Sequence, residues 1–181
     1  MSAADMRSLT EFLRGVGAAD VAHTGTTYLA HCAAVYRDMK AWGFDEDEAR
    51  AGLFHSIYGT GLFQKFKLPL ERRGEIRDLI GERAERLAYL LCAVDYESFD
   101  REVERGRPPY RMTNRFTGET TTIAPEDFES VVKLQLIDRL EQLPRSKDWE
   151  FRRASFRRMA ERLGPAAIRR FDEVFAGTSR P

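Results

Sequence analysis

Apolar residues recur every three or four positions along most of this chain, which is the spacing of amphipathic α-helices. Helices of this kind are predicted over residues 5–15, 28–42, 71–80 and 82–94. The charged residues 95–107 are predicted to form a ragged helix or a loop. Residues 110–123 are the only strand-like region, because two strand-like segments flank Thr117 and Gly118, a pattern that predicts a β-hairpin. Residues 21–27 are predicted to be a linker before the second helix. The pattern therefore predicts an all-α fold with a small β-hairpin insertion around 110–123.

One later segment, residues 125–143, is apolar in nearly every direction around a helix axis. Pro125 suits the first position of that helix, and an apolar surface on all sides is typical of a central helix. Two further helices are predicted after it, within residues 148–176, and the first of them runs from Trp149 to Leu163. We expect a single helical domain with a core over about residues 20–145.

The clearest helix start lies at Asp45, where Glu48 completes a capping box. The predicted helix runs through Ala51 and Gly52 to His55, and Gly59 and Gly61 end it. The small residues within it predict close packing against another helix. His55 is then a histidine at the end of a buried helix, beside a break in the backbone.

Charge and cysteine content exclude several classes of protein. The 181 residues contain 29 Lys plus Arg and 29 Asp plus Glu, so no net field favours nucleic acid or an anionic membrane. Cys32 and Cys92 are far apart and form no CxxC pattern, which indicates buried thiols in a reducing compartment. No signal peptide or transmembrane segment is visible, and a cytoplasmic location is expected. The sequence leaves the oligomeric state open.

Four residues are candidate metal ligands: His23, His31, His55 and Asp138. Ligands that project inward from several helices hold metals in helical bundles. Imidazole and carboxylate groups together suit Fe, Mn, Zn or Ni. The alternative is a set of core histidines that do not converge, with side-chain nitrogens more than about 8 Å apart, too far to share a metal.

Three segments place these residues in a recognisable order. His31 follows Tyr28-Leu-Ala at the start of a helix, His55 follows Ala51-Gly-Leu-Phe, and Asp138 lies in Leu136-Ile-Asp-Arg-Leu140. Over about residues 20–145 the order and spacing resemble the HD-domain superfamily of helical metallophosphohydrolases, especially the nucleotide hydrolase domain of stringent-response alarmone enzymes. The chain also resembles HD-like proteins that carry the phrase "AGLFHSxYGT". The resemblance implies an all-helical fold with His31, His55 and Asp138 at metal-ligand positions.

The sequence departs from that family beside His55. The family has a His-Asp pair where this chain has His55-Ser56, and it continues with Glu-Asp where this chain has Tyr58-Gly59. A serine hydroxyl is a poorer ligand and base than a carboxylate, which argues against phosphoester hydrolysis by the family mechanism. His23 would compensate by making the site rich in nitrogen. Since some HD-like proteins are iron oxygenases, oxidative chemistry stays open.

Two functions follow as expectations. The first is a metal-dependent enzyme that acts on a small molecule, by hydrolysis or oxidation, with Ser56 and Tyr58 as candidate catalytic side chains. A packed aromatic is the alternative for Tyr58. The second is a degenerate module that binds a nucleotide, another ligand or a partner without turnover and needs no metal. The basic residues Lys65, Lys67, Arg72 and Arg73 suit either a pocket for an anionic substrate or a solvated surface.

Overall fold

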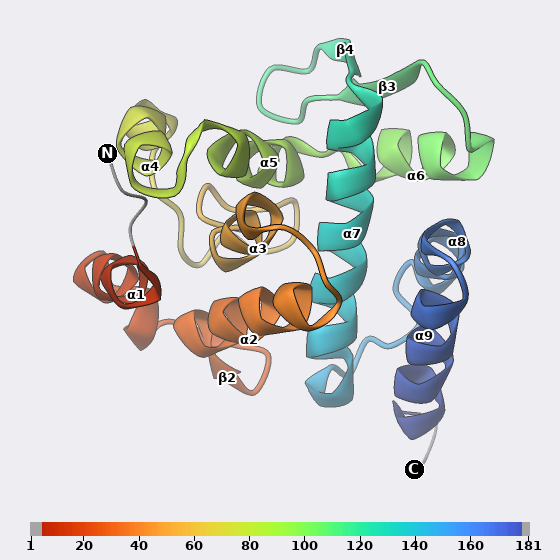
Figure 1. Cartoon of the computed structure of the whole chain (residues 1–181), viewed down its shortest axis with the longest axis horizontal. Coiled ribbons are helices and arrows are strands. Elements are labelled where there is room, and N and C mark those ends of the chain that lie inside the picture. The colour runs from red at the N-terminus through yellow and green to blue at the C-terminus, as the bar shows by residue number, and fades with distance from the viewer. Residues whose placement is uncertain (1–4, 179–181) are drawn as a thin grey trace. The chain divides into compact units, whose positions relative to one another are not determined.

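The computed structural model describes residues 5–178, and in that range it contains nine α-helices and two small antiparallel hairpins (Figure 1). This confirms the predicted mostly-α fold with a β-hairpin insertion. The chain divides into two units, residues 1–92 and 93–181, and each is described by itself. The assignment of the whole chain to one HD-like domain stays a prediction.

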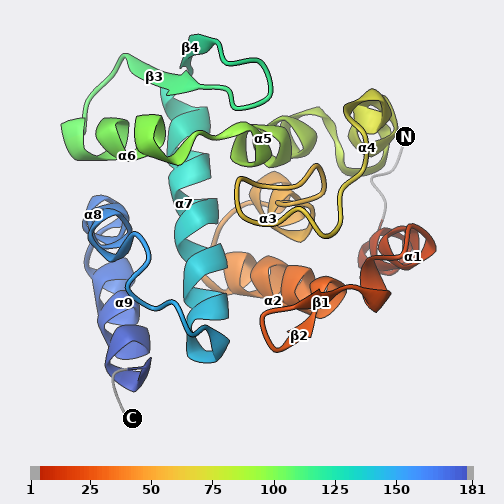
Figure 2. The ribbon, with the colours of Figure 1, turned by 180° about the vertical axis from the view of Figure 1, so that it is seen from behind.

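Five helices make up the first unit, and α2 and α3 lie side by side in it. Figure 2 shows from behind the irregular segment that connects α3 to α4. The helices span α1 (Met6–Gly15), α2 (Tyr28–Ala41), α3 (Glu46–Leu53), α4 (Arg73–Ile80) and α5 (Glu82–Ala93).

Helix α3 begins as predicted and ends earlier than predicted. Asp45 Oδ1 accepts from the Glu48 N–H at 2.9 Å, and Glu48 Oε2 accepts from the Asp45 N–H at 3.3 Å, which confirms the capping box. The small residue Ala49 is fully buried, as close packing against another helix requires. The helix stops at Leu53, so His55 lies in the turns that follow it rather than in its last turn.

A second hairpin precedes α2, where the sequence pattern predicted only a linker. Strands β1 (Ala22–His23) and β2 (Thr26–Thr27) pair through a two-residue turn. Thr24 and Gly25 both have positive φ, 34° and 73°, as a tight hairpin turn of this length requires. The interpretation of residues 110–123 as the only strand-like region was therefore wrong. The hairpin leads directly into α2, whose N-cap is Thr27.

In the second unit, α7 (Pro125–Gln142) is the longest of the described helices, and ten of its residues are buried. Its buried residues are Asp127, Phe128, Ser130, Val131, Val132, Leu134, Gln135, Leu136, Ile137 and Leu140. Strands β3 (Tyr110–Thr113) and β4 (Thr120–Ile123) form the predicted hairpin. The Tyr110 ring stacks on Phe128 at 3.9 Å between centroids, so the hairpin is supported by α7.

The remaining helices of this unit are α6 (Tyr96–Arg105), α8 (Arg153–Leu163) and α9 (Pro165–Thr178). Helix α6 is regular where a ragged helix or a loop was predicted, and Asp95 caps it by accepting from the Ser98 N–H. Helix α8 starts four residues after the predicted Trp149, because Arg152 adopts a left-handed conformation with φ 50°. Among the helices of residues 5–178, none is long and apolar enough to cross a membrane.

Candidate metal centre

The side chains of His31 and His55 meet inside the first unit. His31 lies one turn after the start of α2, and His55 lies just beyond the end of α3. Their Nε2 atoms are 3.2 Å apart, and the two rings are nearly perpendicular at 85°. Their exposed fractions are 0% and 2%. Two imidazoles are thus brought together out of contact with solvent.

The end of α3 sets the orientation of the His55 ring. His55 Nδ1 lies 2.8 Å from the carbonyl oxygen of Gly52, and since a carbonyl only accepts, Nδ1 donates. The neutral ring then carries its lone pair on Nε2, which faces His31. A second contact holds the backbone, because Cys92 Sγ donates to the His55 carbonyl at 3.2 Å. Metal-ligating histidines are held in the same way by a bond from their second ring nitrogen.

The spacing of the two nitrogens fits one metal ion. With metal–nitrogen bonds of about 2.0–2.1 Å, adjacent ligand nitrogens lie about 3.3 Å apart in tetrahedral geometry and about 2.9 Å apart in octahedral geometry. The observed 3.2 Å lies between these values. The alternative of histidines that do not converge is therefore wrong for this pair.

Ser56 is the third polar group at this position. It is 2% exposed, its Oγ lies 3.3 Å from His55 Nε2, and it donates to the hydroxyl oxygen of Tyr28 at 3.2 Å. Burial raises the pKa of the Tyr28 hydroxyl, which therefore stays protonated. We call His31, His55, Ser56 and Tyr28 the histidine cluster. It contains no carboxylate of its own.

His23 lies against this cluster, on β1. Its ring centroid is 4.5 Å from that of His31 and 4.6 Å from that of Phe63. Phe63 also stacks on Tyr28 at 5.2 Å. All three histidines of the chain are thus gathered in the first unit, although His23 is not among the residues whose donor atoms group together as metal ligands. Its role as a fourth ligand stays a prediction.

Asp138 lies on α7 in the second unit, where its Oδ1 accepts from Gln142 Nε2 at 2.5 Å. His31, His55 and Asp138 offer two imidazoles and one carboxylate, a donor set that could hold a divalent metal ion. Which metal this would be, and whether Asp138 is the third ligand, stay predictions.

Tyr58 belongs to a different network, which we call the glutamate cluster: Tyr58, Arg73, Glu85 and Tyr89. The Tyr58 hydroxyl donates to Glu85 Oε1 at 2.9 Å, and Arg73 binds both oxygens of Glu85 at 2.7 and 2.9 Å. The Arg73 guanidinium lies 3.6 Å from the Tyr89 ring centroid. Burial and the Glu85 carboxylate raise the pKa of Tyr58. Its catalytic role stays a prediction.

Sequence reasoning missed Glu85, which is 4% exposed. Its position on α5 could have indicated its burial. Ala88 and Cys92, three and seven residues later, lie on the same face of the helix and are fully buried. Two of the four basic residues considered for an anionic pocket are held in ion pairs: Arg73 with Glu85, and Arg72 with Glu75. Lys65 and Lys67 are exposed.

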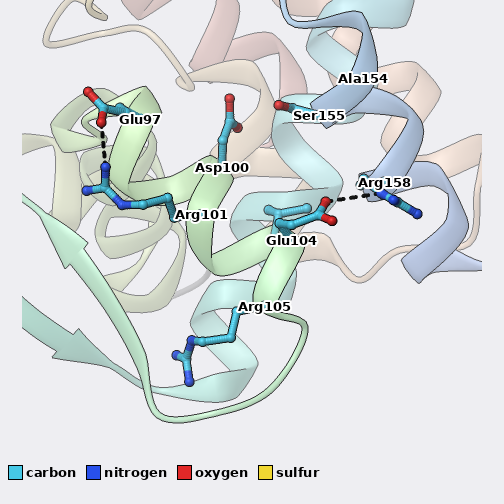
Figure 3. Close-up of a pocket in the computed structure, with 9 residues that line it drawn as sticks. Glu97, Asp100, Arg101, Glu104, Arg105, Ala154, Ser155 and Arg158 are labelled. Atoms are coloured by element: carbon cyan, nitrogen blue, oxygen red, sulfur yellow. Dashed lines mark hydrogen bonds and ion pairs between the residues drawn. The ribbon is translucent and has the colours of Figure 1, made fainter.

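A separate groove in the second unit, with a volume of about 730 Å³, lies between α6 and α8 (Figure 3). Its charged side chains are largely paired with one another or with neighbours. Glu97 binds Arg101 at 2.6 Å, Glu104 binds Arg158 at 3.1 Å, and Asp100 binds Arg152. Since no histidine or cysteine lines it, the groove is a weaker candidate for chemistry than the histidine cluster.

Comparison with known proteins adds one finding. Residues 12–96 match the model of a family described as a domain of unknown function, DUF6817. No curated protein and no solved structure matches the chain. The matched segment covers less than half of the chain, contains all three histidines and ends before Asp138.

Proposed function

We propose that this chain is a metal-dependent enzyme that acts on a small molecule, by hydrolysis or oxidation, on a scaffold like that of the HD superfamily. The observation that supports this most directly is the 3.2 Å separation of the His31 and His55 Nε2 atoms. The bond from His55 Nδ1 to the Gly52 carbonyl adds to it, because it leaves the facing nitrogen of His55 with its lone pair.

In this proposal His31, His55 and Asp138 hold a divalent transition metal, either Fe, Mn, Zn or Ni, and His23 is the candidate fourth ligand. A bound metal would supply Lewis acidity toward a substrate oxygen. The protein supplies burial, a fixed His55 tautomer, and the two neutral hydroxyls of Ser56 and Tyr28. The Ser56 hydroxyl lies beside His55 Nε2 and donates to the Tyr28 hydroxyl, whose own proton is then available for a hydrogen bond to a substrate.

A second function, ligand binding without turnover, is favoured by one observation. The buried hydroxyl of Ser56 lies beside His55 Nε2, where the resemblance places a carboxylate. A neutral group there binds a cation less strongly and is a poor base. Glu85, a buried glutamate of the first unit, is already bound by Arg73 and Tyr58.

Metal content tests the proposal. The full chain would be purified, stripped with a chelator, and titrated separately with Fe²⁺, Mn²⁺, Zn²⁺ and Ni²⁺. We expect one of these metals to bind the wild-type chain. His55→Ala should weaken that binding by at least about 100-fold, since even the hydrogen-bond partners of metal ligands contribute 10–100-fold to metal affinity. Asp138→Asn keeps the shape of the side chain and is expected to lower the affinity for the same metal. His23→Ala tells a three-ligand site from a four-ligand site.

Cys92→Ser provides the matched control, because Cys92 is a ligand-type residue whose sulfur donates to the His55 carbonyl. It should retain the metal. If the wild-type chain takes up none of the four metals, or if His55→Ala binds as tightly as the wild type, the proposed metal centre is wrong. Metal binding without any turnover, together with stabilisation by a nucleotide, would instead support the second function.

A further inference from the structure

Gln135 lies in the middle of α7, and its carboxamide is buried. The residue is 5% exposed. Within residues 5–178, neither its Nε2 nor its Oε1 has a hydrogen-bond partner. A carboxamide offers two donors and an acceptor, and buried polar groups in proteins are nearly always hydrogen-bonded. This side chain therefore calls for an explanation beyond the packing of α7.

Packing alone does not require an amide at this position. The neighbouring residues Leu134 and Leu136 are fully buried, as is Val131 one turn earlier. A methionine or leucine would fill the same volume without leaving polar atoms unsatisfied. Gln142, the other glutamine of α7, shows the contrast, because its Nε2 donates to Asp138.

Gln135 and Asp138 share one face of α7. Residues three apart on a helix lie on adjacent turns of the same side, with their side chains within reach of one group. A ligand held at Asp138 would thus meet the Gln135 carboxamide. This places the unsatisfied amide next to the carboxylate that the proposed function uses.

We propose that Gln135 is a ligand-binding residue that recognises an amide-like edge of the substrate, an inference that rests on the proposed metal centre at Asp138. Both the nitrogen and the oxygen of Gln135 need partners, so the matching group must accept and donate side by side. Carboxamides, lactams and nucleobases have such an edge, and glutamine pairs with adenine in this way. A phosphate or carboxylate only accepts, and it would leave Oε1 unsatisfied.

Acetamide is the minimal probe for this edge, and acetone is its control, because acetone accepts without donating. Each would be titrated into the full wild-type chain and into Gln135→Met, with the Gln135 side-chain ¹⁵N–H₂ signal and the thermal midpoint as readouts. We expect acetamide to shift this signal more than acetone does. Acetamide should also raise the midpoint of the wild type relative to that of Gln135→Met. Gln64→Met, at an exposed glutamine, should respond as the wild type does.

Gln135→Met without any probe should melt higher than the wild type by about 2–4 °C, because it removes a buried unsatisfied amide. Gln135→Leu serves as a second variant with the same expected behaviour. The inference is wrong if acetamide affects the wild type and Gln135→Met equally, or if acetone moves the Gln135 signal as much as acetamide.

The metal content of the same samples separates this inference from the proposed function. A chain that binds no metal but responds to acetamide through Gln135 would overturn only the metal centre. A chain that binds metal but shows no Gln135-dependent response would overturn only the role of Gln135.

Discussion

The first unit contains two buried polar clusters, the glutamate cluster and the histidine cluster, and they differ in how their polar atoms are paired. In the glutamate cluster, the Glu85 carboxylate is matched by Arg73 and by the Tyr58 hydroxyl, so charge and hydrogen bonds are balanced within it. In the histidine cluster, His31 Nε2 and Ser56 Oγ both lie within 3.3 Å of His55 Nε2, and none of the three atoms belongs to a carboxylate. A balanced buried ion pair holds a fold together, whereas converging lone pairs are suited to a cation.

The largest expected effect comes from removing the charge of the glutamate cluster. Glu85→Ala leaves Arg73 and the Tyr58 hydroxyl without their partner, and we expect the free energy of unfolding to fall by about 3 kcal/mol. This is the low end for a buried pair, since Arg73 is partly exposed. Urea denaturation at pH 7 measures it, with Glu75→Ala, at the surface pair with Arg72, as the control that changes little.

The same variant also tests whether the two clusters are separate. If Glu85→Ala, measured where it is still folded, weakens metal binding as much as His55→Ala does, the division into a structural and a functional cluster is wrong. Unchanged metal affinity supports the division.

A smaller effect is expected from changing the charge of the histidine cluster. Ser56→Asp introduces a carboxylate where the resemblance to the HD superfamily places one, and we expect metal affinity to rise on the order of tenfold because a carboxylate replaces a neutral hydroxyl. Without metal the same variant should be less stable than the wild type, since a buried carboxylate lacks a partner. Chelator competition and thermal melting give the two values.

Ser56→Asn is the matched control for this change, since it has the size of aspartate without the charge. Equal metal affinity for Ser56→Asn and Ser56→Asp would show that charge at this position does not control binding.

The smallest expected effect is on the pH dependence of stability, through the buried hydroxyls of Tyr28 and Tyr58. The pKa values of Tyr28 and Tyr58 are raised in the folded chain, mainly by burial, relative to about 10 in the unfolded chain. Their contribution to stability is therefore complete below about pH 10 and is lost as the pH rises above it. Tyr28→Phe should cost about 1 kcal/mol at pH 7 through the lost bond from Ser56.

With Tyr28→Phe, the free energy of unfolding should also fall less steeply with pH above pH 10, since one titrating group is removed. Urea denaturation between pH 8 and 11 measures the slope. A slope identical to that of the wild type would mean that Tyr28 does not titrate with unfolding.

Local sequence signals predicted much of the fold. The predictions of the capping box at Asp45, the hairpin at 110–123 and a helix from Pro125 were all correct, because each depends on neighbours within a few residues. The hairpin at His23 was missed since a strand of two residues has no periodicity to detect. The Arg73–Glu85 pair was missed because it joins two helices, and residue types alone do not show which surface charges are buried.

Part of the candidate centre could be predicted in the same way. The meeting of His31 and His55 was expected from the order of the segments, and the structure confirms it. The position of Ser56 at His55 Nε2 and the bond from His55 to Gly52 depend on where α3 ends, which was predicted two residues too late. Side-chain directions change by about 100° per residue on a helix, so an error of this size hides such contacts.

The bond between His55 and the Gly52 carbonyl has a consequence for protein engineering. If α3 were one turn longer, the N–H of Ser56 would claim that carbonyl, since helical bonds run from each N–H to the fourth residue before it. Substitutions that favour helix over residues 54–57 would thus compete with the imidazole for a single acceptor. A design that raises thermal stability by extending α3 should therefore weaken the bond that orients the His55 ring, although His55 itself has not been changed.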